Sequence, residues 1–503
     1  MTKYINNDLS INPLNNKRSI IFFATLLTLC VVYVLPIILA DRLYIDDILR
    51  SQTGKTRWWV NARPLADSVM EWMNFNGTNI VDVSPLNLLL AILIFSYCSF
   101  LYYQRNMQCF RPLIGSFMMF LVVANPFMLE NLSYKFDVLP MVLSISVLLI
   151  PFIFLSNVYI LSVVAIICIV SSLCLYQASL GFFVCLSIIE FNKYISSNDQ
   201  NKLQNAFKFV ILRVIQLVIA YIIYSQISHH YISGEYNIKH SQPVSFNYVG
   251  MTSVFEHALV YIGKINLYLQ EIQYIVYLLI AALLVHIAKT TYLTFKTNGV
   301  SLLTISSVLI LIVSSTAIVS FSFLHLSFLK YPVYSDRVLI SFGGVTLFFT
   351  WCYFSISKAK IYSCLLSVPL LVFCMVYSYS YGNALKHQKE FDAVLSASLA
   401  GKISELDPDA KKSVLTYGNQ PSSKQRTNTV KRFQSLKSLV PLYYTGGWWG
   451  TQLIKMYGIK NTVVGATTLQ QACDMKKEFE NQTYQIYSDE SNLLITFERA
   501  NCK

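Results

Sequence analysis

Two adjacent carboxylates offer the clearest chemistry in this chain. Asp46 and Asp47 lie in a polar stretch that also contains Arg50 and Arg63. A carboxylate held beside a hydroxyl can act as a general base and take its proton, and an arginine can bind a phosphate through two parallel hydrogen bonds. We therefore predict that Asp46 or Asp47 is catalytic. The alternative is that the pair is solvated or caps the start of a helix.

Other polar residues that can serve such a site occur in three further places. Trp58 and Trp59 either stack on a sugar or belong to the aromatic belt at a membrane surface. Lys135 and Asp137 either pair with each other or contribute to the site. Arg337 suits phosphate binding, or it simply extends from the end of a span toward water. These alternatives stay open on the sequence alone.

The sequence does not predict a bound metal or a soluble cofactor. His229, His230 and His240 lack a spaced acidic or cysteine partner, so loop histidines of this kind rarely bind zinc. The chain has no Walker loop, no dinucleotide-binding fingerprint and no Gly-x-Ser-x-Gly motif. A substrate donor delivered within the membrane is therefore favoured over a nucleotide, and whether a divalent cation assists is left open.

The elements that position these residues are membrane-spanning helices. Of the 503 residues, 54% are hydrophobic and 13% are charged, which excludes a disordered chain and a basic nucleic-acid-binding protein. A helix crosses the hydrocarbon core with about 20 apolar residues. About eleven stretches meet this criterion: residues 19–40, 85–103, 113–129, 138–155, 158–175, 180–191, 209–227, 274–295, 301–321, 338–356 and 361–381.

The distribution of positive charge predicts the orientation of these helices. With the amino terminus in the cytoplasm, lysines and arginines gather at every even-numbered connection, which is the positive-inside pattern and helps to explain the net charge of +13. The first span has no small-residue cleavage site, so we expect a retained helix rather than a signal peptide. The candidate residues then fall in outer segments, which are 41–84, 130–137, 228–273, 322–337 and 382–503.

The end of the chain has a different composition. Residues 382–503 contain no span and predict a soluble outer α/β domain, whereas residues 1–381 form the multi-span domain. Cys473 and Cys502 either pair in an oxidising compartment or remain free thiols. The expected elements are helices at 384–406 and 468–481 and strands at 413–417, 461–465, 482–487 and 493–497.

Two of the outer segments resemble those of a known family. Residues 44–50 (YIDDILR), with Gly54, Trp58 and residues 63–65 (RPL), resemble the first outer loop of the bacterial and phage serotype-converting O-antigen glucosyltransferases, the Gtr membrane glucosyltransferases. Residues 134–137 (YKFD), which lead into a span containing Pro-Met, resemble the second outer loop of that family. The resemblance covers the membrane portion and says little about the tail.

The resemblance implies an architecture and a reaction. The protein is expected to be an α-helical polytopic membrane protein, GT-C-like, in the bacterial inner membrane, with a C-terminal periplasmic α/β domain. It is expected to transfer glucose, with inversion, from undecaprenyl-phosphate-glucose to the lipid-linked O-antigen of lipopolysaccharide, which is serotype conversion. Asp46 or Asp47 is then the base. The expected substrate-binding residues are Arg50, Trp58, Trp59, Arg63, Tyr134, Lys135, Asp137, Lys330 and Arg337.

Further expectations concern the partners and the competing functions. Membrane lipids, the flippase and the donor synthase of the same pathway are expected partners, whereas nucleic acid is not. An O-antigen polymerase or ligase would also need outer arginines and a lipid-phosphate leaving group. A transporter of lipid-linked sugars would bury ionisable residues within its spans or show an inverted repeat. The carboxylate pair after the first span and the outer tail of about 120 residues favour the transferase.

Overall fold

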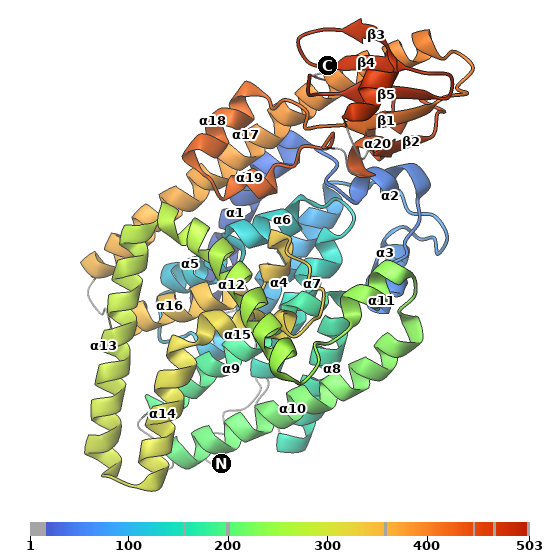
Figure 1. Ribbon diagram of the computed structural model, residues 1–503. Helices are drawn as coiled ribbons and strands as arrows, with labels where there is room; N and C mark the ends of the chain where they lie inside the picture. Colours follow the sequence, from blue (N-terminus) through green and yellow to red (C-terminus); the bar gives the residue numbers. More distant parts are fainter. Residues whose placement is uncertain are drawn as a thin grey trace. The chain divides into compact units, whose positions relative to one another are not determined.

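The chain forms two compact units. The computed structural model describes residues 17–153, 157–197, 202–356, 360–445, 448–465 and 469–499 (Figure 1). We call Met1–Val34 together with Lys55–Val376 the membrane unit, and Leu35–Gly54 together with Tyr377–Lys503 the C-terminal unit. The short stretch that carries Asp46 and Asp47 therefore belongs to the same unit as the end of the chain.

The membrane unit is built from α-helices. Two of its helices, α1 (Lys17–Ala40) and α17 (Lys360–Leu406), continue into the C-terminal unit. The others are α3 (Pro64–Met73), α4 (Leu86–Asn106), α5 (Pro112–Val123), α6 (Pro126–Ser133), α7 (Val138–Val147), α8 (Val158–Leu175), α9 (Leu180–Ile195), α10 (Lys202–Tyr231), α11 (Glu235–Ser241), α12 (Tyr248–Glu271), α13 (Gln273–Asn298), α14 (Leu302–Thr316), α15 (Ile318–Ser327) and α16 (Phe342–Ile356).

In the part of the chain that the structure describes, fewer helices than the eleven expected stretches have the length and composition of a membrane span. Among the described residues, eight helices are long and apolar enough to cross a membrane, or up to ten if two bent pairs each count as one span. The expected span 113–129 is the pair α5 and α6, bent by 68°, and the expected span 301–321 is the pair α14 and α15, bent by 71°. The polytopic helical character is thus confirmed.

Local sequence explains two of the interrupted helices. At the bend between α5 and α6, the Asn125 side chain accepts a hydrogen bond from the amide of Met128 at 3.1 Å, and Pro126 begins the new helix. An asparagine cap followed by proline is a strong start signal for a separate helix. The expected span 138–155 also falls short, because α7 ends at Val147 and a 3-10 turn with Pro151 follows.

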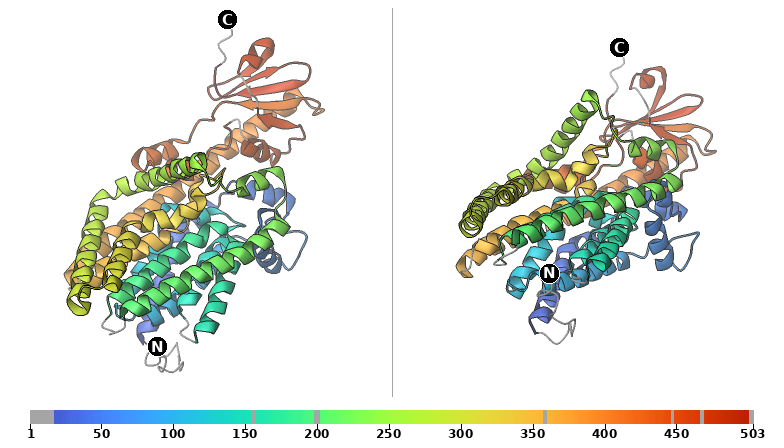
Figure 2. Two further views of the ribbon diagram at one scale, coloured as in Figure 1. Left: turned by 60° about the horizontal axis from the view of Figure 1, so that its bottom comes forward. Right: turned by 90° about the horizontal axis from the view of Figure 1, so that it is seen from below.

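Small residues allow close packing between helices of the membrane unit. A Cβ atom on Gly181 of α9 would lie 1.9 Å from the backbone oxygen of Ser322 in α15, and one on Gly343 of α16 would lie 2.3 Å from that of Val122 in α5. Helices in lipid associate through such close backbone contacts. Figure 2 shows the long helix α10 lying along α8 and α9, and α13 lying beside α14.

The C-terminal unit contains a mixed five-stranded sheet. Its strands are β1 (Ser413–Tyr417), β2 (Val463–Gly465), β3 (Lys476–Glu480), β4 (Gln485–Ser488) and β5 (Asn492–Thr496), in the order β2-β1-β5-β4-β3. Strand β1 pairs in parallel with β2 and β5. Strand β4 pairs antiparallel with both β3 and β5. The end of α17 covers the sheet through a core that includes Leu395, Leu399, Ile403, Val414 and Ile495.

Most of the expected elements of the tail are present. The strand at 413–417 is confirmed, and the other three expected strands overlap β2, β4 and β5. The expected helix at 468–481 is wrong, because a short 3-10 turn, η5 (Gln470–Asp474), is followed by the edge strand β3. Pairing with β4 overrides the helical preference of a charged segment. Cys473 is disulfide-bonded, and its predicted partner Cys502 lies outside the described residues.

Candidate active site

The carboxylate pair lies at the start of a short helix in the C-terminal unit. Asp47 is the first residue of α2 (Asp47–Thr53), and Asp46 precedes it. Asp47 is fully buried, and its Oδ2 atom accepts a hydrogen bond from the backbone amide of Tyr44 at 3.0 Å. Asp46 is partly exposed and makes no side-chain cap to the helix. The two carboxylates therefore differ in burial, and the Tyr44 amide fixes the orientation of Asp47.

The loop that leads to Asp47 is anchored to residues near the end of the chain. The hydroxyl of Tyr44 donates to the carbonyl of Leu439 at 2.9 Å, and the hydroxyl of Tyr443 donates to the carbonyl of Leu43 at 2.7 Å. Burial raises the pKa of Tyr443 to about 12, so this phenol stays protonated and able to donate. These contacts join residues about 400 positions apart in the sequence and fix the loop within its unit.

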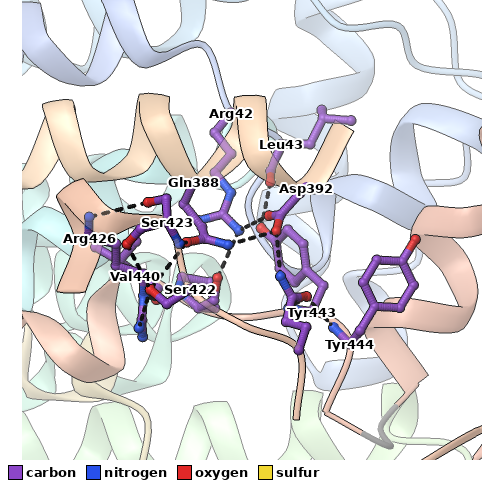
Figure 3. A network of polar contacts seen from close by, with 12 residues as sticks. Arg42, Leu43, Gln388, Asp392, Ser422, Ser423, Arg426, Val440, Tyr443 and Tyr444 are labelled. Atoms are coloured by element: carbon purple, nitrogen blue, oxygen red, sulfur yellow. Dashed lines mark hydrogen bonds and ion pairs between the residues drawn. The ribbon is translucent and has the colours of Figure 1, made fainter. Parts of the chain in front are cut away.

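A buried ion pair completes this attachment (Figure 3). The Arg42 guanidinium donates to Asp392 Oδ2 at 2.7 Å and to the carbonyl of Pro441 at 2.8 Å. Two amides, from Gln388 at 2.8 Å and Gln420 at 2.7 Å, donate to the other oxygen of Asp392. Arg42 and Asp392 are only 5% and 3% exposed, so the pair depends on these hydrogen bonds to offset its loss of hydration.

The membrane unit contains a cluster of cations stacked on tyrosines. The Arg63 guanidinium lies 4.6 Å from the centre of the Tyr176 ring, and that of Arg337 lies 5.0 Å from the centre of the Tyr134 ring. Arg337 also donates to the Tyr134 hydroxyl. Burial lowers the pKa of Arg63; Tyr176 opposes this effect, whereas the charge of Arg337 adds to it. The two guanidiniums are thus close enough to influence each other.

Neighbouring polar groups fix both arginines. The Glu130 carboxylate accepts from the backbone amide of Arg337 at 2.6 Å, and the carbonyl of Arg337 accepts from the Asn131 side chain at 3.0 Å. The Arg63 Nε atom donates to Gln177 Oε1 at 2.7 Å. Two fixed cations of this kind suit a phosphate, because their geometry does not need to reorganise when charge develops on it.

Trp58 and Asp137 are joined in the same unit. The buried indole of Trp58 donates to Asp137 Oδ1 at 2.5 Å, and the backbone amide of Trp58 donates to Asp67 at 3.2 Å. Burial raises the pKa of Asp67. Trp58 is therefore a buried side chain with its indole nitrogen bonded to a carboxylate. Its role in this structure is to hold the Asp137 carboxylate, which also influences Arg63.

The remaining predicted residues lie outside these contacts. Lys135 forms an ion pair with Asp82 at 3.0 Å. Trp59 is 44% exposed, and Lys330 is exposed, with its ammonium 5.4 Å from the Tyr331 ring. Arg50 lies in α2 of the C-terminal unit and is partly buried. Within the described ranges, no group of three or more histidine, cysteine or acidic residues is arranged to hold a metal ion.

Three residues of the arginine cluster were not predicted from the sequence. Glu130 begins a polar segment, and Tyr176 and Gln177 form the break between the apolar stretches 158–175 and 180–191. The break is marked by the 3-10 turn η3 (Gln177–Ser179), from which the Gln177 side chain also donates to Tyr224 at 2.8 Å. Polar residues between two adjacent spans were the available signal, since such residues are costly at membrane depth without a role.

Sequence comparisons relate the chain to known proteins. The chain is 27% identical over 453 residues to an uncharacterized 55.3 kDa protein encoded in the gtrB 5′ region of Salmonella phage P22, a match that covers 87% of this chain and 90% of that protein. No solved structure matches the chain. The family model described as glucosyl transferase GtrII matches residues 35–348, more than half of the chain. The chain therefore belongs to the GtrII glucosyl transferase family.

Proposed function

We propose that this protein transfers glucose from undecaprenyl-phosphate-glucose to a lipid-linked O-antigen on the periplasmic face of the bacterial inner membrane. Family membership supports glucosyl transfer. The many apolar helices and the absence of a nucleotide-binding motif in the sequence favour a lipid-linked donor. The position of the phage relative beside gtrB supports a role in serotype conversion. The positive-inside pattern supports a periplasmic C-terminal unit.

The proposed base is Asp47, and its burial is the observation that carries the proposal. A carboxylate whose orientation is fixed by the Tyr44 amide needs little reorganisation to accept a proton. The acceptor hydroxyl would lose its proton to Asp47 while its oxygen forms the new bond to the anomeric carbon of glucose. Attack from the face opposite the phosphate inverts that carbon.

The leaving group in this reaction is the undecaprenyl phosphate. The bond between the anomeric carbon and the phosphate oxygen breaks, and the phosphate keeps the electron pair. No protonated acid is needed, because cations can stabilise the charge that develops on the phosphate. We assign this role to Arg63 and Arg337, which Tyr176 and Tyr134 hold in place. Asp47 thus takes the proton of the acceptor hydroxyl, whereas Arg63 and Arg337 stabilise the departing phosphate.

Single substitutions of the two aspartates test the proposed base. In Asp47→Asn, the side-chain oxygen can still accept from the Tyr44 amide, so the loop is preserved while the base is lost. We expect a decrease in kcat of about 10²- to 10⁴-fold with little change in the donor KM. Asp46→Asn is the matched control and should retain most activity. Normal glucosylation by Asp47→Asn would contradict the assignment.

A further inference from the structure

A long segment of the C-terminal unit carries positive charge without compensating acidic residues. Residues 410–473 contain nine lysines and arginines and no aspartate or glutamate. Five of these cations lie on α18 (Lys424–Arg432) and α19 (Leu436–Leu439), and the other four lie before or after these helices in the sequence. The side chains of Lys424, Lys431, Arg432 and Lys437 are exposed, which makes this pair of helices a basic surface.

Both helices are fixed firmly to each other. The buried side chain of Arg426 in α18 donates to the carbonyl of Val440 at 2.7 Å and to that of Lys437 at 3.1 Å. These bonds tie the end of α19 to α18. The exposed cations therefore lie on two helices that are held together by hydrogen bonds, and the fold of the unit sets their spacing.

The pair of helices is attached to α17 at two points. At one end, the rings of Phe433 and Tyr377 have centres 5.3 Å apart, and the hydroxyls of Ser435 and Tyr377 are 2.6 Å apart. At the other end, the Ser423 amide donates to Gln388 Oε1 at 2.9 Å. The start of α18 is thus fixed near Gln388 and its end near Tyr377.

These attachment points define depth along the helix axis. Tyr377 lies in the last turn of the apolar stretch 361–381, which is long enough to cross the hydrocarbon core. Gln388 follows 11 residues later, roughly 16 Å further along α17 at 1.5 Å per residue. The headgroup zone on one side of a bilayer is about 5–8 Å thick. The Phe433 end of α18 is therefore attached at the last turn of the apolar stretch, and the Ser423 end is attached beyond it along α17.

We propose that Lys431, Arg432 and Lys437 bind the headgroup phosphates of anionic phospholipids. All three adjoin the Phe433 and Ser435 attachment, are exposed, and have no acidic residue nearby in sequence. Basic side chains at this depth are attracted to a negatively charged bilayer surface. Lys424 is equally exposed but lies at the far end of the same helix, so it should contribute little. This interaction does not depend on the glucosyl transfer reaction.

Lipid binding by the purified full-length chain tests this surface. Native mass spectrometry in neutral detergent would compare the binding of phosphatidylglycerol with that of phosphatidylcholine. We expect wild type to prefer phosphatidylglycerol. The triple variant Lys431→Gln, Arg432→Gln, Lys437→Gln should bind phosphatidylglycerol about fivefold more weakly for each cation removed. Lys424→Gln is the matched control and should resemble wild type.

A charge-conserving variant separates lipid binding from folding. Lys431→Arg with Arg432→Lys and Lys437→Arg should keep the phosphatidylglycerol preference, because only charge at this depth is required. If the triple glutamine variant keeps the full preference, the surface faces another anionic partner and the proposal is wrong. If Lys424→Gln weakens binding as much as the triple variant, position on the helix has no effect and the proposal is also wrong.

Discussion

Loss of the buried Asp392 carboxylate should release the loop that carries Asp46 and Asp47. Asp392→Leu removes the acceptor for three donors, which are Arg42 at 2.7 Å, Gln388 at 2.8 Å and Gln420 at 2.7 Å. It also leaves the Arg42 charge buried without its ion-pair partner. Breaking such a pair typically costs about 3–5 kcal/mol, a large part of the roughly 5–15 kcal/mol that stabilises a domain.

A double-mutant cycle measures this effect. Thermal unfolding in detergent would compare wild type, Asp392→Leu, Arg42→Met and the double variant. We expect the double variant to be more stable than Asp392→Leu, because it no longer buries an unpaired charge. If the two single effects simply add, the pair is not coupled and the reasoning is wrong. Glucosylation should fall in both single variants, since both release the loop.

A nearby exposed pair provides the control for this cycle. Lys389 and Asp41 are 3.1 Å apart, with side chains that are 43% and 60% exposed. Solvent-exposed pairs contribute only about 0–1 kcal/mol. Lys389→Gln should therefore leave both the unfolding midpoint and glucosylation close to wild type. A large loss there would mean that any change near this loop is harmful, whatever its burial.

Three further predictions concern the two units separately. Arg337→Ala should lower kcat/KM for the donor by about tenfold to a hundredfold, and an unchanged value in steady-state assays would favour a role only at the membrane surface. Trp58→Phe removes the indole donor to Asp137 and should cost about 1.5–3 kcal/mol in thermal unfolding; a cost near zero would show that this bond is unimportant. Burial raises the pKa of Asp407, but hydrogen bonds from the Lys412 amide and other donors outweigh it and hold that pKa below its ordinary value of 3.8. The resulting stability is present above pH 3.8 and is lost as the pH falls through the lowered pKa, so the difference in unfolding midpoint between wild type and Asp407→Asn should shrink in acid.

Hydrophobic patterning predicted the helical architecture well. Apolar stretches of about 20 residues are costly to place anywhere except in lipid, so most spans could be recognised without knowledge of their neighbours. Their interruptions depend on local signals such as the Asn125 cap and Pro126, which the apolar average hides. Buried residues alternate along β1 and follow one another in β5, which makes both strands recognisable in the sequence. Strand β3 is charged, and its conformation depends on pairing with β4.

The candidate site was predicted only in part. Polar residues next to spans pointed to Arg63, Asp137 and Arg337, because ionisable groups at membrane depth need a partner or a role. The sequence did not reveal that the Trp58 indole would bind Asp137. It also did not reveal the partner of Arg42, since Asp392 is 350 residues away and only folding brings the two together. Long-range pairing of this kind leaves no periodic signal in the chain.

The shared unit formed by Leu35–Gly54 and Tyr377–Lys503 constrains how such proteins can be recombined. A chimaera that joins two relatives at residue 382 would combine the Arg42 loop of one parent with the tail of the other. The foreign tail would have to supply its own equivalents of Asp392, Leu439 and Tyr443. Grafting a new tail therefore requires transplanting residues 35–54 from the same donor, as one matched piece.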